Sequence, residues 1–336
     1  MTQHTTSGRR PRIWLTVLRL LYCFPLVFLF SGCGKAPDPW PPGPGKRVMT
    51  TFPPLYCFAL NVGGKDASVL CLLGSTSPHD YEPSIQDALK LQKADLFLIN
   101  GLDLDETFAE KLKNNATNEK LKLVKVGESV AEKDRLKMDK KEKEHEHEGH
   151  HHHGEYDPHV WLGLPEAIVM VQCIRDRMKE ADPEHAAGYD QRAGDYIAKL
   201  KELQKEGEAA FKDKQQRKLI SFHDSLGYFA RTFGLTVMET IQPMAGEDPD
   251  PHRLARLVEL CKKEGITVIA VEPNQMSNNA AKTLLEELKK KGVPDAVIVE
   301  TDVLEVAPPE MLKPEHADYY VKKMSENIKA LAKALK

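Results

Sequence analysis

A long stretch without proline, residues 184–213, places the strongest constraint on the fold of this chain. Asp182 and Pro183 stand just before it, and such a pair is typical of a helix N-cap followed by proline at the first helical position. Apolar residues then recur at three- and four-residue steps, which indicates an amphipathic helix: Tyr189, Ala193, Tyr196, Ile197, Leu200, Leu203, Ala210 and Phe211. A helix of that length spans roughly 45 Å, more than either domain needs for its own helices. We therefore expect it to connect two domains.

Strand-like and helix-like segments alternate on both sides of this helix. The predicted strands are residues 47–51, 68–73, 96–99 and 121–126 before it, and 218–222, 235–241, 267–271 and 296–300 after it. The predicted helices are residues 54–62, 84–93, 105–114 and 165–180 before it, and 226–233, 250–265, 278–291 and 314–335 after it. Such alternation favours mainly parallel sheets. The sequence predicts two α/β lobes, residues 47–163 and 217–336, joined by a helical connector, residues 164–216.

The N-terminus reads as an export signal. Four arginines precede or enter an apolar run, Leu20 to Phe30, that is too short to span a bilayer: Arg9, Arg10, Arg12 and Arg19. Residues 29–33, LFSGC, resemble a bacterial lipobox, which predicts a signal peptide over residues 1–32 and a lipid-modified Cys33. A plain secretory signal or an uncleaved anchor is the alternative. Residues 33–46 are rich in proline and glycine and suit a tether between membrane and domain.

Four cysteines remain beyond Cys23 and Cys33, and they lack the spacing of a metal-binding pair. Cys57 and Cys71 lie in adjoining predicted elements, so a disulfide and two buried thiols both stay open. The formal net charge is −3, and acidic residues alternate with the basic ones. That pattern recommends no nucleic-acid partner, and we expect a monomer.

Seven of the 13 histidines lie in residues 144–161. Six of them belong to a charged insertion, residues 128–156, which we call the His-rich loop: His145, His147, His150, His151, His152 and His153. A polar, low-complexity segment of this kind is typical of a solvated loop, and imidazole is a common ligand of Zn(II). We expect weak auxiliary metal sites here. The seventh, His159, follows the loop in a separate motif.

Three histidines and one aspartate occupy matching places in the predicted lobes. His79 and His223 follow strands, His159 precedes a helix, and Asp302 follows the last strand. In open α/β sheets ligands bind at the carboxyl ends of strands, so these side chains are expected to meet. Three imidazoles and a carboxylate suit four-coordinate Zn(II), with Mn(II) as the alternative. Acidic residues that could orient the imidazoles are Asp80, Glu82 and Glu272.

Four motifs of the chain resemble the metal-specific solute-binding proteins of bacterial ABC importers, the ZnuA-like zinc and manganese lipoproteins. They are residues 78–84 (PHDYEPS), 157–162 (DPHVWL), 221–230 (SFHDSLGYFA) and 301–304 (TDVL). The resemblance implies two Rossmann-like lobes, one long connecting helix and a metal in the cleft between the lobes. It assigns His79, His159, His223 and Asp302 as ligands. Manganese members tend to carry Glu at the third position, so His223 and the His-rich loop favour zinc.

The sequence thus predicts an exported lipoprotein facing the periplasm or cell exterior. It would capture Zn(II) as its transported ligand and deliver it to an inner-membrane ABC permease, without being an enzyme. A manganese receptor of the same family is the first alternative. A zinc-dependent hydrolase would need an open coordination site and a base such as Glu82 or Glu272, and the chain has no HExxH motif outside the low-complexity His-rich loop. A surface adhesin or storage module is the third alternative.

Overall fold

The computed structural model describes residues 38, 40, 45–138, 154–242, 251–276 and 278–336. Contacts divide the chain into residues 1–38 and one compact unit, residues 39–336, and the fold below is that of the compact unit. The predicted signal peptide, Cys33 and the six histidines of the His-rich loop lie outside the described residues. No helix among the described residues is both long enough and apolar enough to cross a membrane.

The first lobe contains a parallel sheet with the strand order β2-β1-β3-β4. Its strands are β1 (Lys46–Thr50), β2 (Ala67–Cys71), β3 (Leu96–Ile99) and β4 (Lys122–Lys125). Its helices are α1 (Pro53–Gly63), α2 (Ile85–Leu91) and α3 (Glu106–Asn115). Strand β3 is buried at every position, as expected for an apolar run in a parallel sheet. Ser84 and Asp87 form a capping box that starts α2.

The second lobe repeats this topology with the order β6-β5-β7-β8, also parallel throughout. Its strands are β5 (Lys218–Ser221), β6 (Thr236–Thr240), β7 (Val268–Val271) and β8 (Val297–Glu300). Its helices are α6 (Gly227–Phe233), α7 (Pro251–Glu264) and α8 (Asn279–Lys290). The Asn278 side chain accepts a hydrogen bond from Ala280 N–H and begins α8. The predicted two-lobe α/β class is confirmed.

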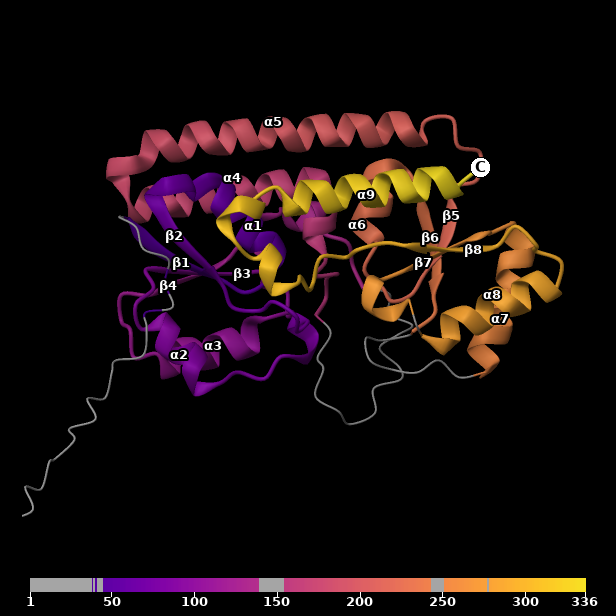
Figure 1. Ribbon diagram of the computed structural model, residues 1–336, viewed down its shortest axis with the longest axis horizontal. Coiled ribbons are helices and arrows are strands. Elements are labelled where there is room, and N and C mark those ends of the chain that lie inside the picture. Colours follow the sequence, from indigo (N-terminus) through magenta and orange to yellow (C-terminus); the bar gives the residue numbers. More distant parts are fainter. Residues whose placement is uncertain (1–37, 39, 41–44, 139–153, 243–250, 277) are drawn as a thin grey trace, which may run out of the picture. The chain divides into compact units, whose positions relative to one another are not determined.

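Three helices form a layer that runs along both lobes (Figure 1): α4 (Leu164–Ala181), α5 (Ala186–Phe211) and α9 (Tyr319–Ala334). Helix α5 has 26 residues, a length of about 39 Å. It packs against α1 and α4 of the first half and against α6 and α9 of the second. The last helix begins at Tyr319, later than predicted, because Pro314 opens a separate 3₁₀ turn, Pro314–His316.

Short 3₁₀ turns complete the described secondary structure: Gly64–Asp66, Pro78–Asp80, Gly127–Ser129, Glu132–Asp134, Val160–Leu162, Pro183–His185, Pro273–Gln275, Pro309–Met311 and Pro314–His316. Two of them matter below, because Pro78–Asp80 contains the first candidate ligand and Val160–Leu162 follows the second.

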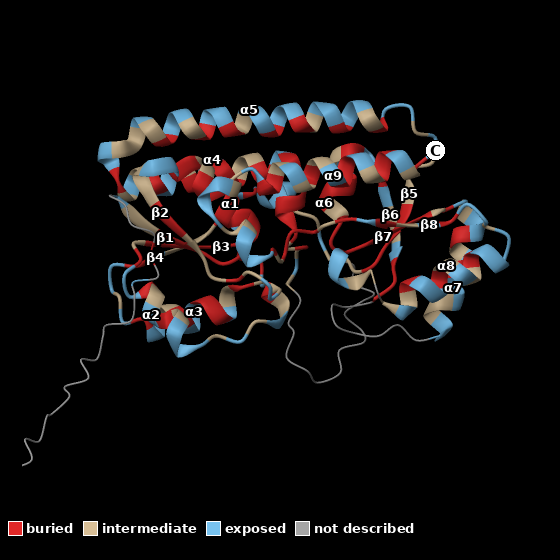
Figure 2. Cartoon of the chain, viewed as in Figure 1, coloured by how far each residue is buried: buried red, intermediate tan, exposed pale blue. Residues whose placement is uncertain are grey.

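The main hydrophobic core is continuous through the helical layer (Figure 2). It joins buried residues of the first sheet with β5, β7 and β8 of the second lobe, while a smaller cluster lies between the second sheet and α7 and α8. Trp40, inside the segment predicted as a tether, is also buried, and its Nε1 donates to the carbonyl of Lys90 at 3.2 Å. The two lobes therefore share one core.

Gly207 of α5 packs closely against the second lobe, since an added Cβ would overlap the ring of Phe233. Gly194 on the same helix has open space around that position. We expect Gly207→Ala to lower the free energy of unfolding by about 1–3 kcal/mol through overpacking. Gly194→Ala should raise it by up to about 1 kcal/mol through helix propensity. Denaturant unfolding measures both, and equal effects would contradict this close packing.

Candidate metal centre

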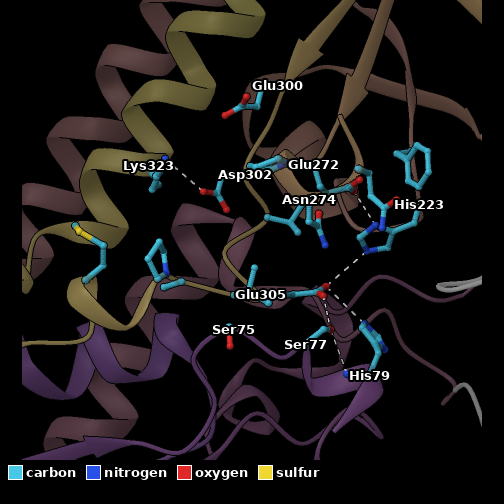
Figure 3. A pocket seen from close by; sticks show the side chains of 18 of the residues that line it. Ser75, Ser77, His79, His223, Glu272, Asn274, Glu300, Asp302, Glu305 and Lys323 are labelled. Carbon is cyan, nitrogen blue, oxygen red and sulfur yellow. Dashed lines mark hydrogen bonds and ion pairs between the residues drawn. The ribbon is translucent and has the colours of Figure 1, made fainter. Parts of the chain in front are cut away.

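Four side chains converge between the lobes: His79, His159, His223 and Glu305. Each offers one ligand atom, and these atoms all lie within 4.8 Å of one another. Oε1 of Glu305 lies 3.5 Å from Nε2 of His79, 3.2 Å from Nε2 of His159 and 3.6 Å from Nε2 of His223. Figure 3 shows Glu305 between His79 and His223.

The topology explains why these residues meet. His223 lies two residues beyond β5, and Glu305 lies in the loop after β8. His79 lies in the loop after β2, within the turn Pro78–Asp80, and His159 directly precedes the turn Val160–Leu162. The three strands end toward the same cleft, which is the usual binding position in open parallel sheets.

The four facing atoms are buried, and none of them has a hydrogen-bond partner: Nε2 of His79, His159 and His223, and Oε1 of Glu305. Buried polar atoms normally find partners, so four converging unpartnered atoms that can each ligate a metal form a candidate site for an ion. Zinc–nitrogen and zinc–oxygen bonds of about 2.0–2.1 Å in a tetrahedron place ligand atoms about 3.3 Å apart. The Oε1–Nε2 distances of 3.2–3.6 Å are close to that value.

Two carboxylates hold the outer nitrogens of the imidazoles. Nδ1 of His159 lies 2.7 Å from Oδ1 of Asp157, and Nδ1 of His223 lies 2.7 Å from Oε1 of Glu272. A proton on each Nδ1 turns Nε2 toward the centre as an electron-pair donor. Glu272 was expected in this role. Asp157 was not, although it stands two residues before His159 in the same motif, where its Oδ1 also accepts from the backbone N–H of His159 at 2.9 Å.

Asp80 and Glu82, the other expected acceptors, are exposed. Within the described part of the chain, neither makes a hydrogen bond or ion pair with a ligand imidazole. They therefore do not orient the centre in this structure.

The charged side chains of the centre shift one another's pKa values. Burial opposes protonation of His159, but Asp157 and Glu305 outweigh it and raise the pKa of His159 to about 9. Burial likewise opposes protonation of His223, whereas Glu272 and Glu305 raise the pKa of His223 well above its usual value. For Glu305, burial acts to raise the pKa, but the three histidines lower the pKa of this carboxyl well below its usual range. The metal-free centre thus holds protons that a metal ion must displace.

The structure places Glu305, and not the predicted Asp302, beside the three histidines. Oδ1 of Asp302 accepts from the backbone N–H of Leu304 at 2.9 Å, and Oδ2 lies 3.5 Å from Nζ of Lys323. The Asn327 side chain binds the Asp302 backbone twice. Its Oδ1 accepts from the N–H of Asp302 at 2.8 Å, and its Nδ2 donates to the carbonyl of Asp302 at 2.7 Å. Leu304 then adopts a left-handed φ of 64°, and the chain turns so that Glu305 faces the centre.

The second lobe also forms hydrogen bonds with the segment that carries His159. Nε1 of Trp161 donates to the carbonyl of Val303 at 2.8 Å, and the Tyr320 hydroxyl donates to the carbonyl of Trp161 at 2.5 Å. The Tyr228 hydroxyl donates to the carbonyl of Asp157 at 3.0 Å. The segments that carry the candidate ligands of the two lobes are therefore joined by hydrogen bonds.

A cavity of about 600 Å³ adjoins the centre (Figure 3). Its lining includes Ser77 and His79 from the first lobe and His223, Glu272 and Glu305 from the second. The lining continues past Asp302 and Lys323 to Met311 and Tyr319. The cavity thus opens beside candidate ligands that are themselves largely buried.

The four described cysteines, Cys57, Cys71, Cys173 and Cys261, are free thiols in this structure. Burial raises the pKa of Cys57 to about 12. A thiol with such a pKa stays protonated and makes a poor metal ligand at neutral pH.

Residues 48–334 match the family model described as zinc-uptake complex component A, periplasmic. Zinc-binding protein AdcA of Streptococcus pyogenes serotype M3 is 36% identical over 260 residues, which are 75% of this chain and 50% of that protein. High-affinity zinc uptake system protein ZnuA of Bacillus subtilis is 30% identical over 331 residues, which are 96% of this chain and 98% of that protein. The chain thus spans about half the length of AdcA.

Solved structures have the same fold. A Zn(II)-bound mutant variant of AdcAII from Streptococcus pneumoniae is 26% identical, with a TM-score of 0.72, and the alignment covers 88% of this chain and 100% of that chain. A laminin-binding adhesin of Streptococcus agalactiae also has a TM-score of 0.72, with 87% and 100% covered, at 23% identity. At that identity the second likeness concerns the fold alone.

Proposed function

We propose that this chain, which belongs to the periplasmic component A family of zinc-uptake complexes, is an extracytoplasmic receptor that binds Zn(II) and delivers it to an ABC permease of the inner membrane. His79, His159, His223 and Glu305 would hold the ion. The observation that carries the proposal is their four buried, unpartnered ligand atoms, in which Oε1 of Glu305 lies 3.2–3.6 Å from the three Nε2 atoms, close to the ligand spacing around a tetrahedral ion.

Zinc is favoured over manganese by the ligand set. Three imidazoles and one carboxylate suit a borderline metal that accepts four ligands, whereas Mn(II) prefers more oxygen ligands. The names of the relatives AdcA and ZnuA, which refer to zinc, support the same choice. A manganese receptor remains the alternative that the titration below would reveal.

Hydrolysis is disfavoured by the same geometry. Four protein ligands close the coordination sphere, whereas catalytic zinc keeps a position for water. Glu272, one of the two candidate bases, is already engaged with Nδ1 of His223 at 2.7 Å. Glu82, the other, is exposed and is not among the residues that line the cavity. A binding role is consistent with both placements.

The remaining parts of the proposal concern export and tethering. Residues 1–32 would direct secretion and Cys33 would carry the lipid anchor, so that a monomeric receptor faces the periplasm or cell exterior. One relative, from Streptococcus pneumoniae, is named a zinc-binding lipoprotein, at 34% identity over 292 residues. The histidines of the His-rich loop, His145, His147 and His150 to His153, would act as weak collecting sites.

Titration of the metal-depleted chain from Gly34 onward with Zn(II) and Mn(II) tests the proposal, because this chain keeps the whole compact unit, residues 39–336. We expect one tight Zn(II) site, weakened by at least about 100-fold in His223→Ala, where a ligand is lost. Weaker sites should disappear when the loop is shortened. Tight binding unchanged in His223→Ala would refute the assigned centre, and equal preference for Mn(II) would refute zinc as the cargo.

The structure defines where the loop can be shortened. Lys137 and Tyr156 form an antiparallel bridge, and the N–H of Met138 donates to the carbonyl of Glu155 at 3.2 Å. The N–H of Leu136 donates to the Tyr228 hydroxyl at 3.0 Å, next to the candidate centre. Residues 139–153 should therefore be replaced by a short Gly-Ser turn, which keeps both contacts and the tight site.

A further inference from the structure

The two oxygens of the Glu305 carboxylate have different surroundings. Oε1 is buried without a hydrogen-bond partner and faces Nε2 of all three histidines. Oε2 accepts a hydrogen bond from the hydroxyl of Ser77 at 2.7 Å. Ser77 belongs to the first lobe and Glu305 to the second, 228 residues apart. Figure 3 shows the Ser77 and Glu305 side chains next to each other.

The same hydroxyl also contacts the first histidine. Ser77 is the N-cap of the turn Pro78–Asp80, and its Oγ accepts from the backbone N–H of His79 at 3.2 Å. A serine hydroxyl has one proton to donate and lone pairs to accept with. A lone pair of the Ser77 hydroxyl accepts from the backbone N–H of His79, and the hydroxyl proton is donated to Oε2 of Glu305. One side chain thus links the segment that carries His79 to the carboxylate of the other lobe.

We propose that Ser77 is a positioning and specificity-determining residue that limits Glu305 to one-oxygen coordination. This inference rests on the proposed metal-binding function. With Oε2 engaged by Ser77, the carboxylate supplies only Oε1, and the centre offers three nitrogens and one oxygen. Four ligands suit tetrahedral Zn(II). Mn(II) prefers about six ligands, mainly oxygens, so its coordination would be incomplete here.

Removing the hydroxyl would free Oε2 to bind the ion. The carboxylate could then coordinate through both oxygens, as it does with larger, harder cations. The ion would gain an oxygen ligand, which favours Mn(II), and the carboxylate would lose the hydrogen bond that orients it for Zn(II). Loss of such an orienting partner typically reduces metal affinity by about 10- to 100-fold.

The experiment compares Ser77→Ala, Ser77→Thr and the control Ser84→Ala in the metal-depleted chain from Gly34 onward. Ser84 is also an N-cap in the first lobe, with its Oγ accepting from Asp87 N–H at 3.3 Å, and its hydroxyl donates to the neighbouring Asp87 rather than to Glu305. The control therefore removes a cap without altering the centre. Ser77→Thr keeps the hydroxyl and should rescue the wild-type behaviour.

We expect Ser77→Ala to weaken Zn(II) binding by about 10- to 100-fold and to leave Mn(II) binding equal or stronger, so that the preference for zinc narrows. Substituted Co(II) gives an independent readout, because four-coordinate Co(II) absorbs visible light more strongly than five-coordinate Co(II). Its absorption should fall in Ser77→Ala and persist in Ser77→Thr and Ser84→Ala.

A zinc-to-manganese preference and a Co(II) spectrum that are the same in Ser77→Ala and Ser84→Ala would overturn the inference while leaving the receptor proposal intact. If the wild-type chain itself bound neither Zn(II) nor Co(II) tightly, the proposed function would fail first. Thermal unfolding of each variant verifies that the comparison is made on folded protein.

Discussion

Replacement of Glu305 by glutamine is expected to weaken Zn(II) binding by at least about 100-fold. The substitution preserves the size of the side chain, and its amide oxygen can still accept from Ser77 at the position of Oε2. The amide nitrogen would then take the place of Oε1 among the three imidazoles, and an amide N–H₂ cannot ligate a metal. The centre loses both a ligand and the negative charge of Glu305, which faces the ion directly. Isothermal titration or competition with a chelator measures the change.

Asp302→Asn is the matched control, because Asp302 lies in the same loop and was the carboxylate favoured by the sequence. Asparagine can still accept from the N–H of Leu304, and the ion pair with Lys323 that it removes is partly exposed. Such a pair contributes up to about 1 kcal/mol, so Zn(II) affinity should stay within about fivefold of wild type. If Asp302→Asn abolished binding and Glu305→Gln did not, Asp302 would be restored as the fourth ligand.

The choice between these carboxylates shows where sequence reasoning stops. Asp302 lies two residues beyond β8, close to the carboxyl end of the strand, which is the usual place for a ligand in a parallel sheet. Glu305 stands three residues later, and nothing in the order of residues indicates which one turns inward. The left-handed φ at Leu304 and the two hydrogen bonds between Asn327 and the Asp302 backbone decide it, and Asn327 lies on α9, 25 residues along the chain.

The three candidate histidines follow from their places at the ends of predicted elements together with the family motifs that contain them, residues 78–84, 157–162 and 221–230. His79 and His223 follow apolar runs that read as strands, and His159 opens a helical segment. Glu272, the hydrogen-bond partner of His223, could also be predicted from the sequence, because it directly follows β7. Asp157 could have been found from its spacing, because an aspartate two residues before His159 commonly accepts a hydrogen bond from that residue's backbone N–H.

The two-lobe α/β fold could be predicted from the alternation of strand-like and helix-like segments, because each segment shows its type in its own local sequence. The order β2-β1-β3-β4 and the single core shared by both lobes are long-range properties, and no stretch of sequence specifies them by itself. The start of α9 shows a local ambiguity. Pro314 suits the first turn of a long helix as well as a short 3₁₀ turn, and only the packed structure separates Pro314–His316 from Tyr319–Ala334.

The metal-free centre is expected to stabilise the fold in a defined pH range. Protonated His159 contributes stability below the unfolded histidine value of about 6.5, and this contribution is lost as the pH rises through its folded pKa of about 9. The pKa of Glu305 is lowered, so its contribution is present above the unfolded value of about 4.3 and is lost at lower pH. Thermal unfolding of metal-free protein should therefore show the largest contribution of the centre between these two unfolded values.

Zinc affinity should rise with pH, whereas the stability contributed by protonated His159 falls. The rise should continue to pH values well above the usual pKa of a histidine. The ion needs the neutral imidazole, and in the metal-free centre the pKa of His159 is about 9 while the pKa of His223 is also raised. Each proton that zinc displaces makes the apparent affinity rise about tenfold per pH unit up to that pKa. We expect this rise to continue between about pH 7 and 8.5, where histidines near 6.5 would give a plateau.

Calorimetry in buffers of different ionisation enthalpy counts the protons released, and the wild type should release at least one per zinc at about pH 7.5. Asp157→Asn gives the decisive comparison, because the Asp157 carboxylate is the largest of the causes that raise the pKa of His159. With a neutral side chain there, His159 should lose its proton at lower pH. Proton release should then fall, and the plateau of affinity should begin earlier. An affinity that does not change between about pH 7 and 8.5 in the wild type would refute a centre that holds its protons through Asp157, Glu272 and Glu305.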